Sequence, residues 1–164
     1  LQCSNQKTEN KGGPDYLLLV TDSDGKSGYS NLRGEVVIPP GKYSMCLTDT
    51  FKSHAVVVKD HRFVVIDRQE KELYEVFPFD NGPDYPADGL FRIMQNGKIG
   101  YADAGSFQVV ITPQYDCAEP FVNGTARVSV HCQQETDGEH SRWVSDNWTY
   151  IDKKGQAVKA PATN

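Results

Sequence analysis

The sequence lacks the long apolar runs of a membrane protein and the positive charge of a nucleic-acid-binding protein. Its longest runs of aliphatic residues, such as residues 17–20, have four members, whereas a membrane-spanning helix needs about 20. Acidic side chains outnumber basic ones by 22 to 17, which gives a net charge of −5. A protein that follows a phosphate backbone needs a basic surface, so we expect no nucleic-acid partner.

Sequence motifs of catalysis and metal binding are also missing. There is no Gly-rich phosphate loop, no Gly-x-Ser-x-Gly turn and no His-x-x-x-His pair. Residues 22–25 resemble the start of a calcium loop, but its last ligand position holds Arg33, where such a loop requires Glu. His54 is expected to face Asp67 across a strand pair, either as half of a catalytic arrangement or as a simple surface pair. We favour the surface pair, and we expect a protein that is not an enzyme and binds no metal or cofactor.

The four cysteines carry information about the compartment. Their spacings fit no zinc site, which needs paired ligands about two to four residues apart. In an oxidising compartment Cys117 and Cys132 would form a disulfide, because the loop between them is short. Cys3 follows the apolar Leu1 and precedes a polar stretch, which resembles the start of a bacterial lipoprotein with an acylated cysteine. A disulfide of Cys3 in a secreted protein and an inert free thiol are the alternatives.

The N-terminal segment differs in composition from the rest of the chain. Residues 1–15 are polar and carry almost no apolar side chain, so we expect a flexible tether that cannot bury enough surface to fold. Residues 16–164 form the expected single folded domain. The tether and the cysteines together predict an extracytoplasmic protein, secreted or at a bacterial cell envelope, that meets a membrane only through a lipid on Cys3.

Internal repeats indicate the fold. A motif with an apolar or aromatic centre followed by Asp or Asn recurs with its centre at Tyr29, Val65, Tyr101 and Tyr150. The first three centres are 36 residues apart, and the last follows after 49 because of an insertion of 13 residues. A period of this size is typical of an array of supersecondary units.

Each unit is expected to contain three short strands and a return connector. Asp24-Gly25 and Asn96-Gly97 predict two-residue type I′ hairpins, which would place Val20 opposite Tyr29 and Arg92 opposite Tyr101. In the same way Val56 is expected opposite Val65. The polar residue that follows each motif, at Asn31, Asp67, Asp103 and Asp152, is expected to cap a turn. The sequence thus predicts an all-β tandem repeat of short antiparallel hairpin or meander units, as a short solenoid or a partly closed, propeller-like array.

Several segments carry a resemblance to a known family. They are Gly97–Tyr101, Ile111–Asp116, Phe121–Val128 and Trp148–Gly155. These segments are similar to the WG β-repeat family, and the similarity extends over about residues 16–161. The resemblance implies a structural or binding module, mostly found in bacterial secreted or envelope proteins, without an assigned reaction.

The insertion is the feature of the sequence most suggestive of function. Asp137-Gly138 predicts that residues 131–143 lengthen one hairpin, with Gln134 opposite Ser141 and Cys132 opposite Trp143. Projections confined to one unit often lie on the working face of a repeat protein. We expect binding of a protein or glycan partner through Arg142, Trp143 and Trp148, since such side chains are frequent at interface hot spots. An envelope enzyme such as a glycan hydrolase is the alternative, and the sequence leaves the oligomeric state open.

Overall fold

The structure is a computed structural model, and it describes residues 15–163. Within these residues all regular secondary structure is β. The strands are β1 (Leu17–Thr21), β2 (Ser27–Ser30), β3 (Val36–Ile38), β4 (Met45–Cys46), β5 (Thr50–Phe51), β6 (His54–Lys59), β7 (Arg62–Asp67), β8 (Glu72–Val76), β9 (Pro78–Phe79), β10 (Gly82–Pro83), β11 (Leu90–Gln95), β12 (Lys98–Asp103), β13 (Val109–Tyr115), β14 (Cys117–Ala118), β15 (Thr125–Ser129), β16 (Gln133–Asp137), β17 (His140–Val144), β18 (Thr149–Asp152) and β19 (Ala157–Val158).

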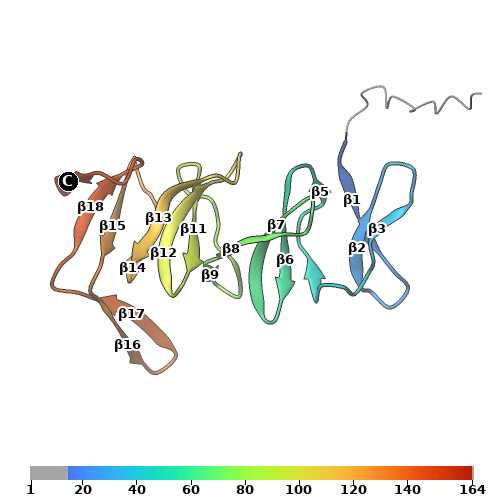
Figure 1. Cartoon of the computed structure of the whole chain (residues 1–164). Coiled ribbons are helices and arrows are strands. Elements are labelled where there is room, and N and C mark those ends of the chain that lie inside the picture. The colour runs from blue at the N-terminus through green and yellow to red at the C-terminus, as the bar shows by residue number, and fades with distance from the viewer. Residues whose placement is uncertain (1–14, 164) are drawn as a thin grey trace, which may run out of the picture.

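The strands form four antiparallel meanders that stand side by side in an open row (Figure 1). We call them unit 1 (β1–β3), unit 2 (β6–β8), unit 3 (β11–β13) and unit 4 (β15, β18 and β19). Units 2 and 3 share one seven-stranded sheet through the pairing of β8 with β11. None of the sheets closes into a barrel, so the all-β repeat fold is confirmed as an open array.

The hydrophobic core is divided among the junctions between units. Tyr29 and Phe51 pack with Val57 and Ile66 where unit 1 meets unit 2. A second cluster joins units 2 and 3, and a third, which contains Tyr101, joins units 3 and 4. Burying one such side chain contributes about 1.5–3 kcal/mol. Each unit is therefore stabilised by its neighbour, as the repeat pattern predicts.

The expected turn caps are confirmed in all four units. The Oδ1 atom of Asp67 accepts hydrogen bonds from the backbone N–H groups of Gln69 and Lys71, both at 2.9 Å. The Oδ1 atoms of Asn31 and Asp152 likewise accept from the backbone N–H groups two and four residues further along the chain. The Oδ1 atom of Asp103 accepts from those two and three residues further along. The repeated polar residue therefore ends each central strand and starts a tight turn.

A glycine in the central strand permits a close approach of the third strand in units 1 and 3. A Cβ atom on Gly100 would lie 2.3 Å from the Ile111 carbonyl oxygen and 2.6 Å from the Pro113 nitrogen. The corresponding distances for Gly28 are 2.4 Å to the Ile38 oxygen and 2.6 Å to the Pro40 nitrogen. In unit 3 the approach coincides with a bulge in the strand pairing between Ile99 and Tyr101, and in unit 1 the bulge follows between Tyr29 and Ser30. At both positions glycine avoids the clash that a Cβ atom would cause.

The expected hairpin registers are correct in units 2 and 3 but wrong in unit 1. Val56 pairs with Val65 and Arg92 with Tyr101. Val20 pairs with Gly28 instead of Tyr29. The cause is the β1–β2 turn, where Gly25 has a positive φ of 78° and Asp24 is absent from the residues with positive φ. This turn has one residue more than a type I′ turn, and the extra residue shifts the pairing by one.

The insertion forms the expected hairpin, β16–β17, but its expected register is wrong by two residues. Gln134 pairs with Trp143, and Thr136 pairs with Ser141. Gly138 has a φ of 62° and occupies the first central position of the turn, between Asp137 and His140, as in a type II′ turn. The hairpin projects from one long side of the array (Figure 1).

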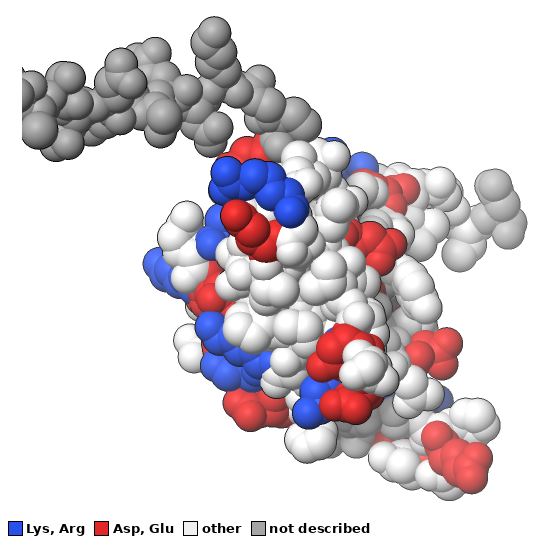
Figure 2. Space-filling model, turned by 90° about the vertical axis from the view of Figure 1, so that its right-hand side faces the viewer, with Lys and Arg blue, Asp and Glu red and all other residues white. Residues whose placement is uncertain are grey.

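The outer end of unit 1 is largely uncharged. In Figure 2, which views the array from this end, uncharged side chains fill the centre of the face and charged side chains stand around it. Leu18, Val36 and Val37 of this unit are exposed.

Candidate functional site

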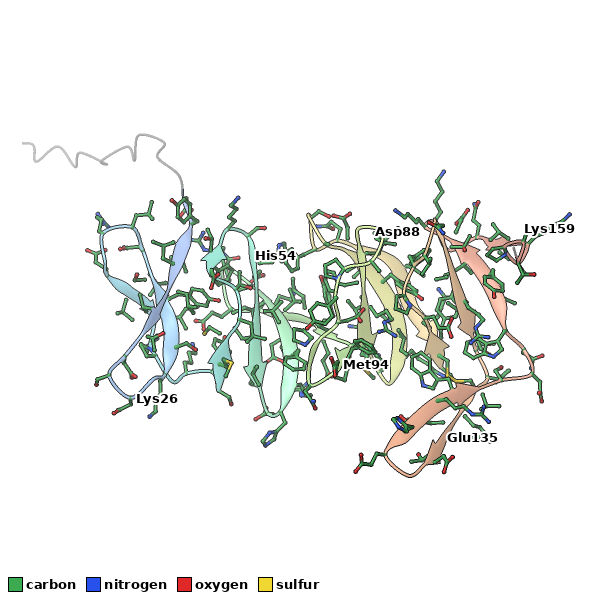
Figure 3. The ribbon with its side chains drawn as sticks, turned by 180° about the vertical axis from the view of Figure 1, so that it is seen from behind. Lys26, His54, Asp88, Met94, Glu135 and Lys159 are labelled. Atoms are coloured by element: carbon green, nitrogen blue, oxygen red, sulfur yellow. A yellow bond between two sulfur atoms is a disulfide. The ribbon has the colours of Figure 1, made fainter. Side chains whose placement is uncertain are left out.

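A groove runs between the inserted hairpin and the side of the array. It has a volume of about 900 Å³ and is lined by the hairpin, by residues 77–80 around β9, by the β11–β12 hairpin, and by Asp116, Glu119 and Arg127. Met94 of β11 lies on the side of the array from which the hairpin with Glu135 projects (Figure 3). The groove exists because Trp143, near the base of the projecting hairpin, packs on the array, while β16 and the outer part of β17 remain exposed.

Trp143 holds the hairpin against the array. Its ring lies 5.7 Å from the ring of Phe77, with the two planes at 60°. Trp143 is half-buried, so it is less exposed than its place in an insertion suggests. Arg142, the neighbouring predicted residue, is exposed and forms an ion pair with Glu135 at 2.9 Å. Both residues line the groove.

The floor of the groove contains a buried ion pair that sequence reasoning missed. Arg92 donates from Nε and one terminal nitrogen to the two carboxylate oxygens of Asp84, at 3.0 and 2.7 Å. Both side chains are 4% exposed. The Arg92 backbone N–H donates to the same carboxylate at 2.8 Å, and its guanidinium stacks on Phe77 at 4.4 Å. Arg92 stands in the middle of the apolar strand β11. An arginine at such a position is visible in the sequence and could have indicated a buried ion pair.

Unit 4 repeats this pair in a more exposed form. Arg127 is the residue of unit 4 that corresponds to Arg92, because it pairs with Tyr150 as Arg92 pairs with Tyr101. It bonds Glu119 at 2.6 Å, and both pairs join an arginine to the acidic residue eight positions before it. This hydrogen bond raises the pKa of the Arg127 guanidinium. The third predicted binding residue, Trp148, stacks on Arg127 at 4.1 Å and lies outside the groove lining.

Two of the three carboxylates that line the groove are paired with cations. Asp116 forms an ion pair with Lys98, and this contact lowers the pKa of the carboxyl group. Glu119 bonds Arg127, as described above. A glycosidase acid needs a raised pKa near a second carboxylate. Asp116, whose pKa is lowered, does not have this property.

Cys117 and Cys132 form a disulfide, with Cα atoms 6.1 Å apart. The bond links β14 to the base of the inserted hairpin. Cys46 is a buried free thiol, and burial raises its pKa. Cys3 lies outside the described residues.

The other candidate sites have structural roles. His54 faces Asp67 across the β6–β7 pair as expected, but the Asp67 carboxylate caps its turn, and the His54 ring stacks on Phe107 at 5.2 Å. The Asp22 carboxylate, at the start of the calcium-like segment, accepts two backbone N–H groups of its own turn. Residues 15–163 contain no group of three or more potential metal-ligating side chains.

Comparison with known proteins identifies the repeat. No helix in the described part of the chain is long and apolar enough to cross a lipid bilayer. No curated protein and no solved structure matches the chain. The family described as WG containing repeat matches residues 99–131, which extend from the central strand of unit 3 to the first strand of unit 4. The chain therefore carries a WG-containing repeat at residues 99–131, and the resemblance found in the sequence is confirmed for these residues.

Proposed function

We propose that this chain is a non-enzymatic binding module that holds a segment of a protein partner in the groove beside the inserted hairpin. One observation carries the proposal. The insertion occurs in a single unit, and its Trp143 packs on Phe77 of another connector, which gives the array a groove of about 900 Å³. Pockets of this volume hold ligands of substantial size.

The chemistry of the groove favours a polypeptide over a glycan. A glycan needs free aromatic faces for stacking, whereas Phe77 contacts both Trp143 and the Arg92 guanidinium. Phe79 has the same guanidinium 5.4 Å from its ring centre. The groove is lined by both apolar and ion-paired side chains, a mixture suited to an extended peptide. A glycan is the second candidate, because Phe79 is half exposed.

We place this function outside the cytoplasm, in a secreted protein or at a bacterial cell envelope. The Cys117–Cys132 disulfide supports this location, since disulfides persist in oxidising compartments. A lipid on Cys3 would be the only link to a membrane. The oligomeric state has no part in the proposal.

The proposal can be tested with ligands selected on the whole protein. Peptides from a random display library and glycans on an array are first screened for binding, and dissociation constants are then measured by calorimetry. Arg142→Ala is expected to weaken the binding of a selected peptide about tenfold or more, because truncation of an interface arginine often has an effect of this size.

The chain offers a matched control in unit 1. Arg33 is as exposed as Arg142, at 79% against 78%, and it also pairs with a nearby glutamate. Arg33→Ala should leave the dissociation constant unchanged. Equal losses for both variants, or none for Arg142→Ala, would show that the selected ligands bind elsewhere. Selection of glycans alone would make the second candidate the correct one.

A further inference from the structure

We infer that the outer face of unit 4 is a second docking surface, which accepts a polypeptide segment with two successive backbone carbonyls followed by Phe. The surface lies beyond the groove and includes the ring of Tyr150, while Arg127 lines both places. It rests on the repetition of one contact set within the chain, where two junctions show the surface occupied.

Unit 3 shows how such a face is occupied. The Tyr101 hydroxyl donates to the Glu119 carbonyl at 2.6 Å, and Arg92 donates to the adjacent Ala118 carbonyl at 3.2 Å. The ring of Phe121 then packs on Tyr101, edge to face, with centres 4.8 Å apart. The connector 118–121 thus docks through two carbonyls and one aromatic ring.

Unit 1 repeats two of these three contacts, without the arginine, because the residue that pairs with Tyr29 is Leu19. The Tyr29 hydroxyl donates to the Thr48 carbonyl at 2.7 Å. Phe51 packs on Tyr29 edge to face at 5.1 Å. In both junctions a Phe follows the accepting carbonyl by two or three positions, so a carbonyl and a nearby Phe are recognised in each.

Unit 4 presents the same donors on its outer side. Tyr150 occupies the position of Tyr29 and Tyr101, and Arg127 occupies that of Arg92. Among residues 15–163 the Nε of Arg127 is buried without a hydrogen-bond partner, whereas the Nε of Arg92 donates to Asp84 and a terminal nitrogen of Arg92 binds the Ala118 carbonyl. The Arg127 side chain is 36% exposed, whereas Arg92, which the next unit covers, is 4% exposed.

A pocket marks the place of the incoming ring. It has a volume of about 260 Å³ and is lined by Tyr150, Arg127, Val122 and Pro161, among others. This volume is below the usual range for small-molecule sites and suits a single side chain. Phe is the expected occupant, because it can pack edge to face on Tyr150 as Phe51 packs on Tyr29 and Phe121 packs on Tyr101.

The test uses the whole chain and a synthetic peptide with the sequence of residues 118–125, Ala-Glu-Pro-Phe-Val-Asn-Gly-Thr. Binding is followed by chemical-shift changes in ¹⁵N-labelled protein, which should concentrate at residues 125–127 and 149–151. Replacing Phe in the peptide by Ala should abolish them. Tyr150→Phe should weaken binding about three- to tenfold through the lost hydrogen bond.

Tyr85→Phe is the control, because Tyr85 is exposed and lies on another connector. A second format joins the peptide to the C-terminus by a flexible Gly/Ser linker, which gives it a millimolar effective concentration. Shifts at Tyr150 in either format that require Phe support the inference. No shifts in both formats, shifts confined to the groove, or equal binding by Tyr150→Phe would overturn it. The groove proposal is judged separately, by Arg142→Ala.

Discussion

Removing the carboxylate of Asp84 should destabilise the protein far more than removing that of Glu119, although the two residues occupy corresponding positions. Asp84 accepts three hydrogen bonds from Arg92, and both side chains are 4% exposed. Asp84→Ala would leave the guanidinium buried without its counter-ion, which costs about 3–5 kcal/mol. For a chain of this length that loss corresponds to a melting temperature about 6–20 °C lower.

Glu119→Ala is the matched control. Its ion pair with Arg127 is 36–40% exposed, so water can replace the carboxylate, and the expected loss is below about 1 kcal/mol. Urea unfolding, followed by tryptophan fluorescence, measures both variants. The double change Asp84→Ala with Arg92→Met should recover part of the loss, because it removes the unpaired charge. Losses of similar size for the two single variants would refute the reasoning.

Three further outcomes follow from other contacts. Gly100→Ala should lower the free energy of unfolding by about 1–3 kcal/mol in urea, because its Cβ would lie 2.3 Å from the Ile111 oxygen. Gly82→Ala, whose Cβ would meet nothing closer than 3.9 Å, should lower it much less. Equal losses would contradict the argument from the close approach. Reduction of the disulfide between residues 117 and 132 should lower the free energy of unfolding by about 3 kcal/mol, and an unchanged urea midpoint with reductant would contradict this. Burial raises the pKa of Tyr29, Tyr74 and Tyr101, so the contribution of these tyrosines to the free energy of unfolding should be constant below about pH 10 and fall as the pH rises further. An equal urea midpoint at pH 9 and pH 11.5 would disprove it.

The repeat architecture was predictable because local chemistry determines it. Asn96-Gly97 and Asp60-His61 adopt positive φ at both residues of their turns, so the hairpin registers of units 2 and 3 follow from the turn. The registers of unit 1 and the insertion were not predictable in the same way. A glycine after Asp suits several turn types, and each type shifts the pairing by one or two residues.

The groove was only partly predictable. Its hairpin and Trp143 follow from the insertion, but Phe77 belongs to a connector distant in sequence, and the contact depends on how the units stack. The Arg92–Asp84 pair had a detectable signal in an arginine at the centre of an apolar strand and in the shared eight-residue spacing to an acid. The spacing alone does not tell which of the two pairs is buried, since burial depends on the neighbouring unit.

The central claim, that the inserted hairpin forms the binding groove, is tested most directly by shortening the hairpin. Gln133 pairs with Val144, so replacing residues 134–143 by Asn-Gly closes a two-residue turn and keeps Cys132 in its disulfide. The dissociation constant of a peptide selected on the whole protein is then measured by calorimetry for both proteins. We predict at least a tenfold loss of affinity in a variant that keeps its β-sheet circular dichroism spectrum. An unchanged dissociation constant in a folded variant would contradict the claim.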